Sequence, residues 1–162
     1  MTTLQRTLEY LDRNDIDYVH STHPIAYTAR EVATVEHMPP HKVAKTVLFL
    51  CEQGYGIVVV PADAFVDFEN LRTEMGVDTV RLATEQELGQ LFAESELGAM
   101  PPFGELFGLT VYFDANLVDE KFIGFNGGTH RDLIHMRVAD FLRLAQPVIG
   151  AFAVHPSLAA IR

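Results

Sequence analysis

Residues 43–51 read VAKTVLFLC, and residues 57–61 read IVVVP after the glycine-containing segment EQGYG at 52–56. Both runs are short and apolar, and they are rich in residue types that favour strands over helices. A connection of a few residues joins consecutive strands in an antiparallel pair. The sequence therefore predicts a β-hairpin at the centre of the fold.

Capped helices and further strands surround this hairpin. The leucines within residues 4–11 have helical spacing, and Asn14 is suited to end that helix. A threonine followed three positions later by glutamate marks two more helix starts, at Thr28–Glu31 and Thr84–Glu87. We expect further helices at 68–75 and 140–145, strands at 18–22, 80–82, 109–113, 122–125 and 133–138, a turn at 114–117 and a final apolar run at 148–154.

Short connections between several of these strands decide the fold class. They are too short to hold crossover helices, so the strands they join must be antiparallel. A mixed β-sheet flanked by helices, an α/β fold of the α+β type, therefore fits better than a doubly wound parallel sheet. No repeat or low-complexity linker divides the chain, so residues 1–162 are expected to form a single domain.

Composition narrows the range of functions. The 162 residues are 48% hydrophobic, which is enough for a sizeable core and excludes a disordered polymer. The net charge of −10 argues against a broad basic face for a nucleic-acid duplex. The single cysteine, Cys51, allows no internal disulfide, and the chain has neither an export signal nor a run of about 18 apolar residues. We therefore expect a cytoplasmic protein that does not enter a membrane.

Lys45 interrupts the most apolar of the predicted strands. On an extended strand it shares a face with Val43, Val47 and Phe49, which places an ammonium group in an apolar row. Burying that charge without a partner is costly. The pattern leaves two interpretations open. Lys45 either reaches water from the start of the strand, or lies at the floor of a pocket where it binds an oxyanion or a carbonyl, or orients water.

Two glycine-containing loops are also candidates for chemistry. The segment GAMPPFG at 98–104 can form a rigid pocket wall with exposed amides, or it can simply cover the core. The segment GGTHRD at 127–132 brings a hydroxyl, an imidazole and a carboxylate together, which suits proton transfer or substrate binding but equally suits a capped turn. Both alternatives stay open for both loops.

Other familiar sites have no support in the sequence. His20 and His23 would face opposite sides of an extended segment, and there is no helical zinc-binding pattern. Glycine patterns that hold nucleotide phosphates are absent. Cys51 has no neighbours that would make it a nucleophile. We therefore expect no metal and no cofactor.

The candidate segments occur in a recognisable order: His23-Pro24, YTAREVA at 27–33, VAKT at 43–46, VVVP at 58–61, ELGAMPPFG at 96–104 and GGTH at 127–130. In order and spacing they resemble the YbaK/prolyl-tRNA editing-domain family of aminoacyl-tRNA deacylases. The resemblance runs from about Leu4 to Phe141. It therefore covers nearly the whole predicted domain.

This resemblance implies a function and a set of site residues. The function is trans-editing, the hydrolysis of the ester that joins a wrong amino acid to the terminal ribose of a tRNA. The implied substrate is a proline tRNA that carries a small amino acid such as alanine or cysteine. The resemblance assigns deacylation to Lys45. The residues expected to bind the substrate are Tyr27, Thr28, Thr46, Gly98, Met100, Pro101, Gly127, Gly128 and His130.

Elementary chemistry suggests a role for each group. Water attacks the ester carbonyl while the ammonium of Lys45 and the amides near Gly98 and Gly127 hold carbonyl or phosphate oxygens. His130 positions the amino acid or the ribose, and the ribose hydroxyl of the substrate can assist. A lysine of ordinary pKa is a poor general base, so we favour an electrostatic role for Lys45.

Two other functions remain open at this stage. One is a non-catalytic protein that binds an aminoacyl group or another small ligand, and the other is a hydrolase of a different small ester. The expected partner is the acceptor end of a mischarged tRNA, with an aminoacyl-tRNA synthetase as a further candidate. Given the net charge of −10, we expect tRNA binding to be weak and sensitive to salt. The cationic groups available for it are Lys42, Lys45, Arg30 and Arg131.

Overall fold

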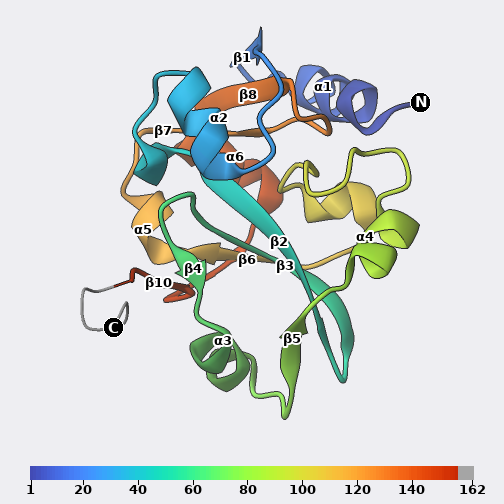
Figure 1. Cartoon of the computed structure of the whole chain (residues 1–162), viewed down its shortest axis with the longest axis vertical. Helices are drawn as coiled ribbons and strands as arrows, with labels where there is room; N and C mark the ends of the chain where they lie inside the picture. The colour runs from blue at the N-terminus through green and yellow to red at the C-terminus, as the bar shows by residue number, and fades with distance from the viewer. Residues whose placement is uncertain (157–162) are drawn as a thin grey trace.

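The predicted hairpin lies at the centre of the computed structural model, which describes residues 1–156 (Figure 1). Strands β2 (Ala44–Cys51) and β3 (Gly54–Pro61) pair antiparallel along their whole length. The connection is shorter than expected, because residues 54–56 already belong to β3. Gly56 allows this pairing, since the ring of Phe49 lies only 2.3 Å from the place where a Cβ of residue 56 would stand.

Three further strands extend the hairpin into a mixed sheet. The strand order is β5-β2-β3-β6-β9, with β5 at Val80–Leu82, β6 at Val111–Asp114 and β9 at Val148–Gly150. Strands β5 and β3 are antiparallel to β2, whereas β6 is parallel to β3 and β9 is parallel to β6. The predicted mixed sheet of an α+β fold is therefore confirmed.

A three-stranded antiparallel sheet lies beside the start of β2. Its order is β1-β8-β7, with β1 at Tyr18–Thr22, β8 at Asp132–Arg137 and β7 at Phe122–Asn126. A single parallel bridge between Val43 and Gly124 joins β7 to the edge of β2. The two sheets are therefore connected at Val43, the residue directly before β2.

The helices begin where the capping patterns predicted them. The side chains of Thr2, Thr28, Asp67 and Thr84 each accept a hydrogen bond from a backbone N–H in the first turn of α1, α2, α3 and α4, respectively. The helices are α1 (Thr3–Arg13), α2 (Ala29–Val35), α3 (Phe68–Met75), α4 (Glu85–Leu91), α5 (Ala115–Val118) and α6 (Val138–Ala145), with 3-10 turns at Pro40–Lys42 and Gly104–Phe107.

One of the predicted elements was wrong. Residues 114–117 were expected to form a turn, but α5 begins there because the side chain of Asp114 accepts the N–H of Asn116 and caps the helix. The apolar run at 148–154 contains β9 and β10, with Phe152 buried between them. No helix within residues 1–156 is long and apolar enough to cross a membrane. The expected domain end at Arg162 lies outside the described residues.

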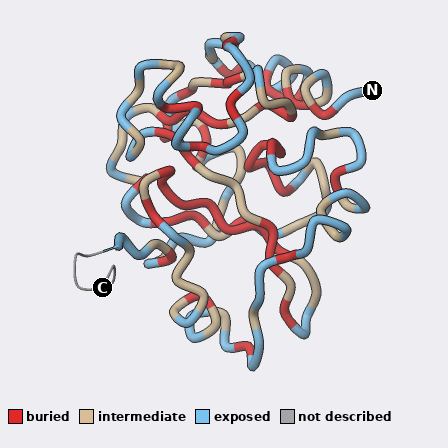
Figure 2. Tube along the Cα trace, in the orientation of Figure 1, coloured by how far each residue is buried: buried red, intermediate tan, exposed pale blue. Residues whose placement is uncertain are grey.

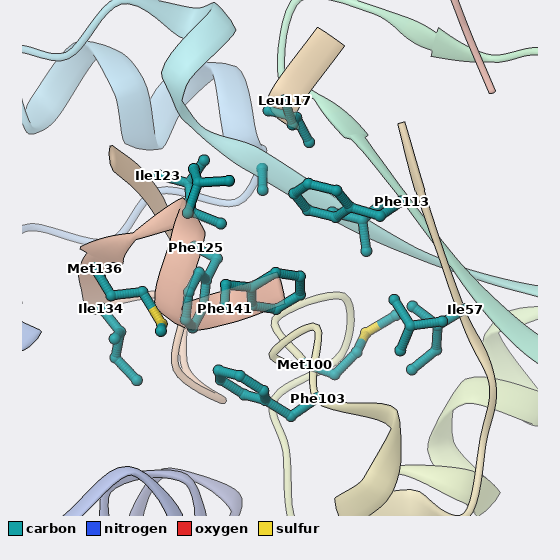
Figure 3. Close-up of a cluster of buried hydrophobic side chains, with 14 of the residues drawn as sticks. Ile57, Met100, Phe103, Phe113, Leu117, Ile123, Phe125, Ile134, Met136 and Phe141 are labelled. Carbon is teal, nitrogen blue, oxygen red and sulfur yellow. The ribbon is translucent and has the colours of Figure 1, made fainter. Parts of the chain in front are cut away.

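Aromatic side chains fill the space between the two sheets. The ring centre of Phe103 lies 5.3 Å from that of Phe125 and 5.5 Å from that of Phe141 (Figure 3). Phe103 and Met100 are both buried, although they belong to the loop at 98–104. Figure 2 shows that the buried parts of the chain gather in the interior of the molecule. The apolar composition of this loop is therefore explained, since its side chains are part of the core.

A buried carboxylate holds the C-terminal segment against the main sheet. Asp114 is only 1% exposed, and its Oδ1 accepts hydrogen bonds from the N–H groups of Phe152 at 2.9 Å and Ala153 at 3.0 Å. Strand β10 (Ala153–Val154) then pairs antiparallel with β4 (Phe65–Val66). This pairing places the end of the described chain beside the segment that follows β3.

We predict that Asp114→Ala lowers the free energy of unfolding by about 2–4 kcal/mol, because it leaves three backbone N–H groups without their acceptor in a buried place. Urea denaturation measures this loss. The matched control is Asp119→Ala, which removes an exposed carboxylate from the same region and is expected to cost less than about 0.5 kcal/mol. Equal losses in the two variants would contradict the anchoring role of Asp114.

Candidate functional site

A cavity of about 520 Å³ lies against β2, a volume within the range of small-molecule sites. Its wall is mostly apolar, with a few polar and charged groups. The lining residues come from the start of α2, from β2, from the segment after β3, from the ends of β5 and β7, from α4, from the loop at 98–104 and from the end of the described chain. They are Tyr27, Thr28, Ala29, Arg30, Lys45, Thr46, Val47, Leu48, Ala62, Asp63, Ala64, Phe65, Leu82, Leu88, Gly98, Met100, Asn126 and Pro156.

The cavity opens where one edge of β2 has no neighbouring strand. At its start this edge is bridged to β7, and from Phe49 onward it pairs with β5 (Figure 1). Residues 45–47 lie in the gap between these two partners. The N–H of Ala83 donates to the carbonyl of Leu48 at 3.0 Å, so Leu48, and Thr46 two residues before it, direct their backbone groups to this edge. The gap thus exposes part of a strand edge to a ligand.

Lys45 lies in the wall of this cavity. Its side chain is half-buried, and its Nζ donates a hydrogen bond to the carbonyl oxygen of Ala64 at 2.7 Å. The same Nζ lies 5.5 Å from the centre of the Phe65 ring, a cation–π arrangement. Of the two interpretations of the strand pattern, the structure therefore favours the lysine in a pocket. Its chemical role stays a prediction.

Burial and neighbouring charges act on Lys45 in opposite directions. Desolvation by burial is the largest effect and lowers the pKa of the ammonium below its usual 10.5. The carboxylate of Asp63 raises this pKa, and the guanidinium of Arg30 lowers it. Burial prevails, so Lys45 gives up its proton more readily than an exposed lysine does.

Several residues implied by the family resemblance line the cavity together with Lys45. They are Tyr27, Thr28, Thr46, Gly98 and Met100. Tyr27 is 67% exposed and lies at the rim. Thr28 accepts the N–H of Glu31 as the cap of α2, so its hydroxyl already has a structural partner. The structure therefore brings five of the nine implied substrate-binding residues to one cavity.

The other implied residues do not line the cavity. Pro101 is buried beside Met100, and the N–H groups expected to bind substrate near Gly127 are already used. The N–H of Gly127 donates to the carbonyl of Asp132 at 2.9 Å, and that of Gly128 to the carbonyl of Ala99 at 2.8 Å. In this structure the N–H groups of Gly127 and Gly128 are therefore already bonded to backbone carbonyls, and substrate binding by amides near Gly127 stays a prediction.

Close packing surrounds the paired glycines. A Cβ at Gly127 would lie 3.1 Å from the Leu4 side chain, and one at Gly128 would lie 3.1 Å from both the backbone nitrogen of Leu4 and the Cβ of Thr3. Gly128 also has a φ of +106°, which L-residues rarely adopt. The positive φ and the close approach to the backbone of α1 favour glycine at position 128, whereas at position 127 a Cβ would crowd the side chains of Leu4 and Ile134.

His130 is near the cavity but outside its lining. Its ring centre lies 5.1 Å from that of Tyr27, and its backbone N–H donates to the carboxylate of Glu96 at 2.6 Å. Its carbonyl accepts the N–H of Ala26. The turn at 127–131 thus links the segments before α2 and before the loop at 98–104. The ring of His130 packs against the ring of Tyr27 at the rim of the cavity.

Two polar residues of the cavity were not singled out from the sequence as site residues. Asp63 carries a charge, and Asn126 has a buried Oδ1 to which no residue within 1–156 donates a hydrogen bond. Asn126 ends β7 directly before Gly127, and Asp63 follows the VVVP strand. Both positions were visible as polar residues at strand ends, which is a common place for functional groups. The sequence did not show that these ends meet.

Residues 23–144 match the aminoacyl-tRNA editing domain, and the chain belongs to this family. The family resemblance detected in the sequence is thereby confirmed. The chain is an aminoacyl-tRNA editing hydrolase, which acts on the ester between an amino acid and tRNA.

Individual relatives agree with this assignment. The Multifunctional Ser/Thr-tRNA deacylase ProXp-y of Escherichia coli (strain K12) is 28% identical over 158 residues, which cover 93% of this chain and 92% of that protein. A proline–tRNA ligase of Thermosipho africanus is 27% identical over 81 residues, 50% of this chain but 14% of the ligase. The crystal structure of a candidate trans-editing enzyme for prolyl tRNA synthetase has a TM-score of 0.82 at 22% identity, covers 95% of this chain and 98% of its own, and supports the fold.

We predict different costs for alanine at the two loop glycines with positive φ. Gly98→Ala, where nothing lies within 4 Å of the new Cβ, should lower the free energy of unfolding by only about 1–2 kcal/mol, from backbone strain. Gly128→Ala adds contacts with the start of α1 and should cost roughly 1–3 kcal/mol more. Urea denaturation of both variants measures the difference. Equal costs would show that the turn does not depend on packing against α1.

Proposed function

We propose that this chain removes a small amino acid from tRNA in the cavity beside β2, with Lys45 as the catalytic residue. The observation that carries the proposal is the half-buried ammonium of Lys45, held at 2.7 Å from the Ala64 carbonyl within a mostly apolar wall. A fixed positive charge in a place of low polarity stabilises developing negative charge better than one in water. The ester carbonyl oxygen becomes negative when water attacks it.

The reaction that follows needs no protein nucleophile. Water forms a bond to the ester carbonyl carbon, the bond from that carbon to the ribose oxygen breaks, and the ribose oxygen takes up a proton. The products are the free amino acid and tRNA. Lys45 holds the carbonyl oxygen during this step, and the neighbouring ribose hydroxyl assists the proton transfer. Arg30, exposed at the start of α2, lies where a phosphate of the terminal nucleotide can be bound.

The wall of the cavity favours small amino acids. The side chains of Leu48, Leu88 and Met100 supply apolar surface, while Thr46 lies next to Lys45 on β2. An apolar wall separates amino acids that differ by one methylene by only about 1–3 kcal/mol. Alanine and cysteine, expected from the sequence, therefore remain in the proposed range. The relation of two relatives to prolyl-tRNA synthesis supports proline tRNA as the carrier.

The side chain of Asn126 extends the proposed substrates to tRNAs that carry serine or threonine. Its Oδ1 is buried at the cavity and receives no hydrogen bond from the described residues, so a donor from a ligand would satisfy it. The hydroxyl of serine or threonine is such a donor. The name of the Escherichia coli relative, a Ser/Thr-tRNA deacylase, supports the same choice.

The proposal also covers the partner and the place of action. The partner is the acceptor end of tRNA, bound weakly and with marked salt sensitivity because the chain carries a net charge of −10. An aminoacyl-tRNA synthetase that bound the tRNA body would compensate for this weak contact. Such editing belongs in the cytoplasm, where tRNA is charged.

We predict that Lys45→Ala lowers kcat/KM for deacylation of misacylated tRNA by at least about 100-fold, since it removes the charge that stabilises the transition state. The matched control is Lys121→Ala, which removes an exposed lysine outside the cavity lining and should leave kcat/KM unchanged. Deacylation of a panel of misacylated tRNAs, with free aminoacyl esters alongside, measures both. Retained activity in a folded Lys45→Ala protein would refute the proposed role.

The pH dependence of the same assay separates two roles for Lys45. If the protonated ammonium is the active form, the rate above spontaneous hydrolysis should fall as pH rises toward the lowered pKa of Lys45. If neutral Lys45 were a general base, the rate should instead rise over the same range. Lys45→Ala supplies the background at each pH.

We predict that Asn126→Ala lowers kcat/KM for seryl-tRNA by roughly 10- to 100-fold and for alanyl-tRNA by less than about threefold, because only serine offers a hydroxyl to the lost acceptor. Steady-state deacylation of the two tRNAs gives the ratio. Asn116→Ala, an exposed asparagine on α5, is the control and should leave the ratio unchanged. An equal loss of kcat/KM on both substrates would show that Asn126 does not select the amino acid.

A further inference from the structure

The cavity contains a single acidic side chain among the lining residues that the structure describes. The charged lining residues are Arg30, Lys45 and Asp63. An aminoacyl ester has both a carbonyl oxygen that becomes negative during hydrolysis and an α-amino group that is positive when protonated, with a usual pKa of about 7.7–8.0 for such groups. We propose, building on the function proposed above, that Asp63 binds the α-ammonium group of the aminoacyl substrate.

The turn that carries Asp63 also positions Lys45. This turn follows β3 and is closed by a hydrogen bond of 3.0 Å from the N–H of Ala64 to the carbonyl of Pro61. Lys45 donates to the carbonyl of Ala64, the residue next to Asp63. The carboxylate is therefore close enough to Lys45 to raise its pKa. This short segment thus carries the negative group, Asp63, and positions the positive group, Lys45, at the same cavity. The two charges are opposite to those of the α-ammonium group and of the carbonyl oxygen that becomes negative during hydrolysis.

The carboxylate of Asp63 is available to a ligand. Within the described residues Lys45 bonds to the Ala64 carbonyl and forms no salt bridge with Asp63. The partner that Asp63 does have is Nε2 of His155, at 3.4 Å, which is long for a hydrogen bond. The Asp63 side chain keeps 29% of its surface exposed. A charged donor from the substrate can therefore reach it.

This arrangement has a consequence for substrate choice. A carboxylate that binds the α-ammonium favours tRNAs whose amino acid has a free amino group. Acylation of that nitrogen removes its positive charge and adds bulk, so formylated, acetylated or peptidyl tRNAs lose the contact. Asp63 therefore directs hydrolysis to newly charged tRNA and away from tRNA that carries a growing chain.

The test compares seryl-tRNA and alanyl-tRNA with their N-acetylated forms. For the wild-type protein we expect kcat/KM to be about 10- to 100-fold higher with the free amine, as a charge-assisted hydrogen bond allows. In Asp63→Asn the ratio of kcat/KM for the free-amine substrate to that for its N-acetylated form should fall below about 3, because the free-amine substrates lose the ion pair. The rate with the N-acetylated substrates should change little. Hydrolysis of the free-amine substrate by the wild type tests the proposed function separately.

Two controls distinguish ligand binding from indirect effects. Asp17→Asn removes one exposed negative charge elsewhere on the surface and should keep the full preference. His155→Ala removes the contact of Asp63 with the C-terminal segment and should also keep it. If Asp63 acted only through the pKa of Lys45, Asp63→Asn would slow both substrates equally. That result, or a wild-type protein indifferent to N-acetylation, would overturn the proposal.

Discussion

The hydrogen bonding of β2 is interrupted along one edge, and the cavity depends on that interruption. Val43, the residue before the strand, is bridged to β7, and the strand pairs with β5 from Phe49 onward, which leaves residues 45–47 without a paired strand on this edge. The other edge is paired with β3 along its whole length, which fixes the strand in place. Lys45 and Thr46 therefore stand on a rigid element while one edge of that element faces a cavity. A fully paired strand would have left no space there.

The loop at 98–104 couples the core to this cavity. Phe103 packs among the aromatic rings between the sheets, and Met100, three residues earlier, is buried and also lines the cavity. We therefore expect a change in core packing at Phe103 to reach the cavity wall at Met100. The prolines between these two residues restrict the backbone and keep the two positions in a fixed relation.

Local patterns predicted the elements well, and contacts between distant segments were harder. The hairpin and the helix caps follow from neighbouring residues, so they could be predicted from the sequence. The charged lysine in an apolar strand also marked the pocket correctly. Asn126 and Asp63 could not be placed, because their meeting at one cavity depends on how separate sheets pack. Gly127 and Gly128 were predicted to bind substrate, and the sequence did not show that their N–H groups are bonded within the fold or that this turn packs against α1.

The C-terminal segment is attached to the fold differently from the rest of the cavity wall. Residues 145–156 follow the part of the chain that matches the editing-domain family, yet Pro156 lines the cavity and His155 approaches Asp63. The segment is attached through Asp114 and a two-residue strand pairing rather than through the central hairpin. This part of the cavity wall is therefore held separately from the strand that carries Lys45. Substitutions within residues 148–156 can then alter the shape of the cavity while Lys45 keeps its place on β2.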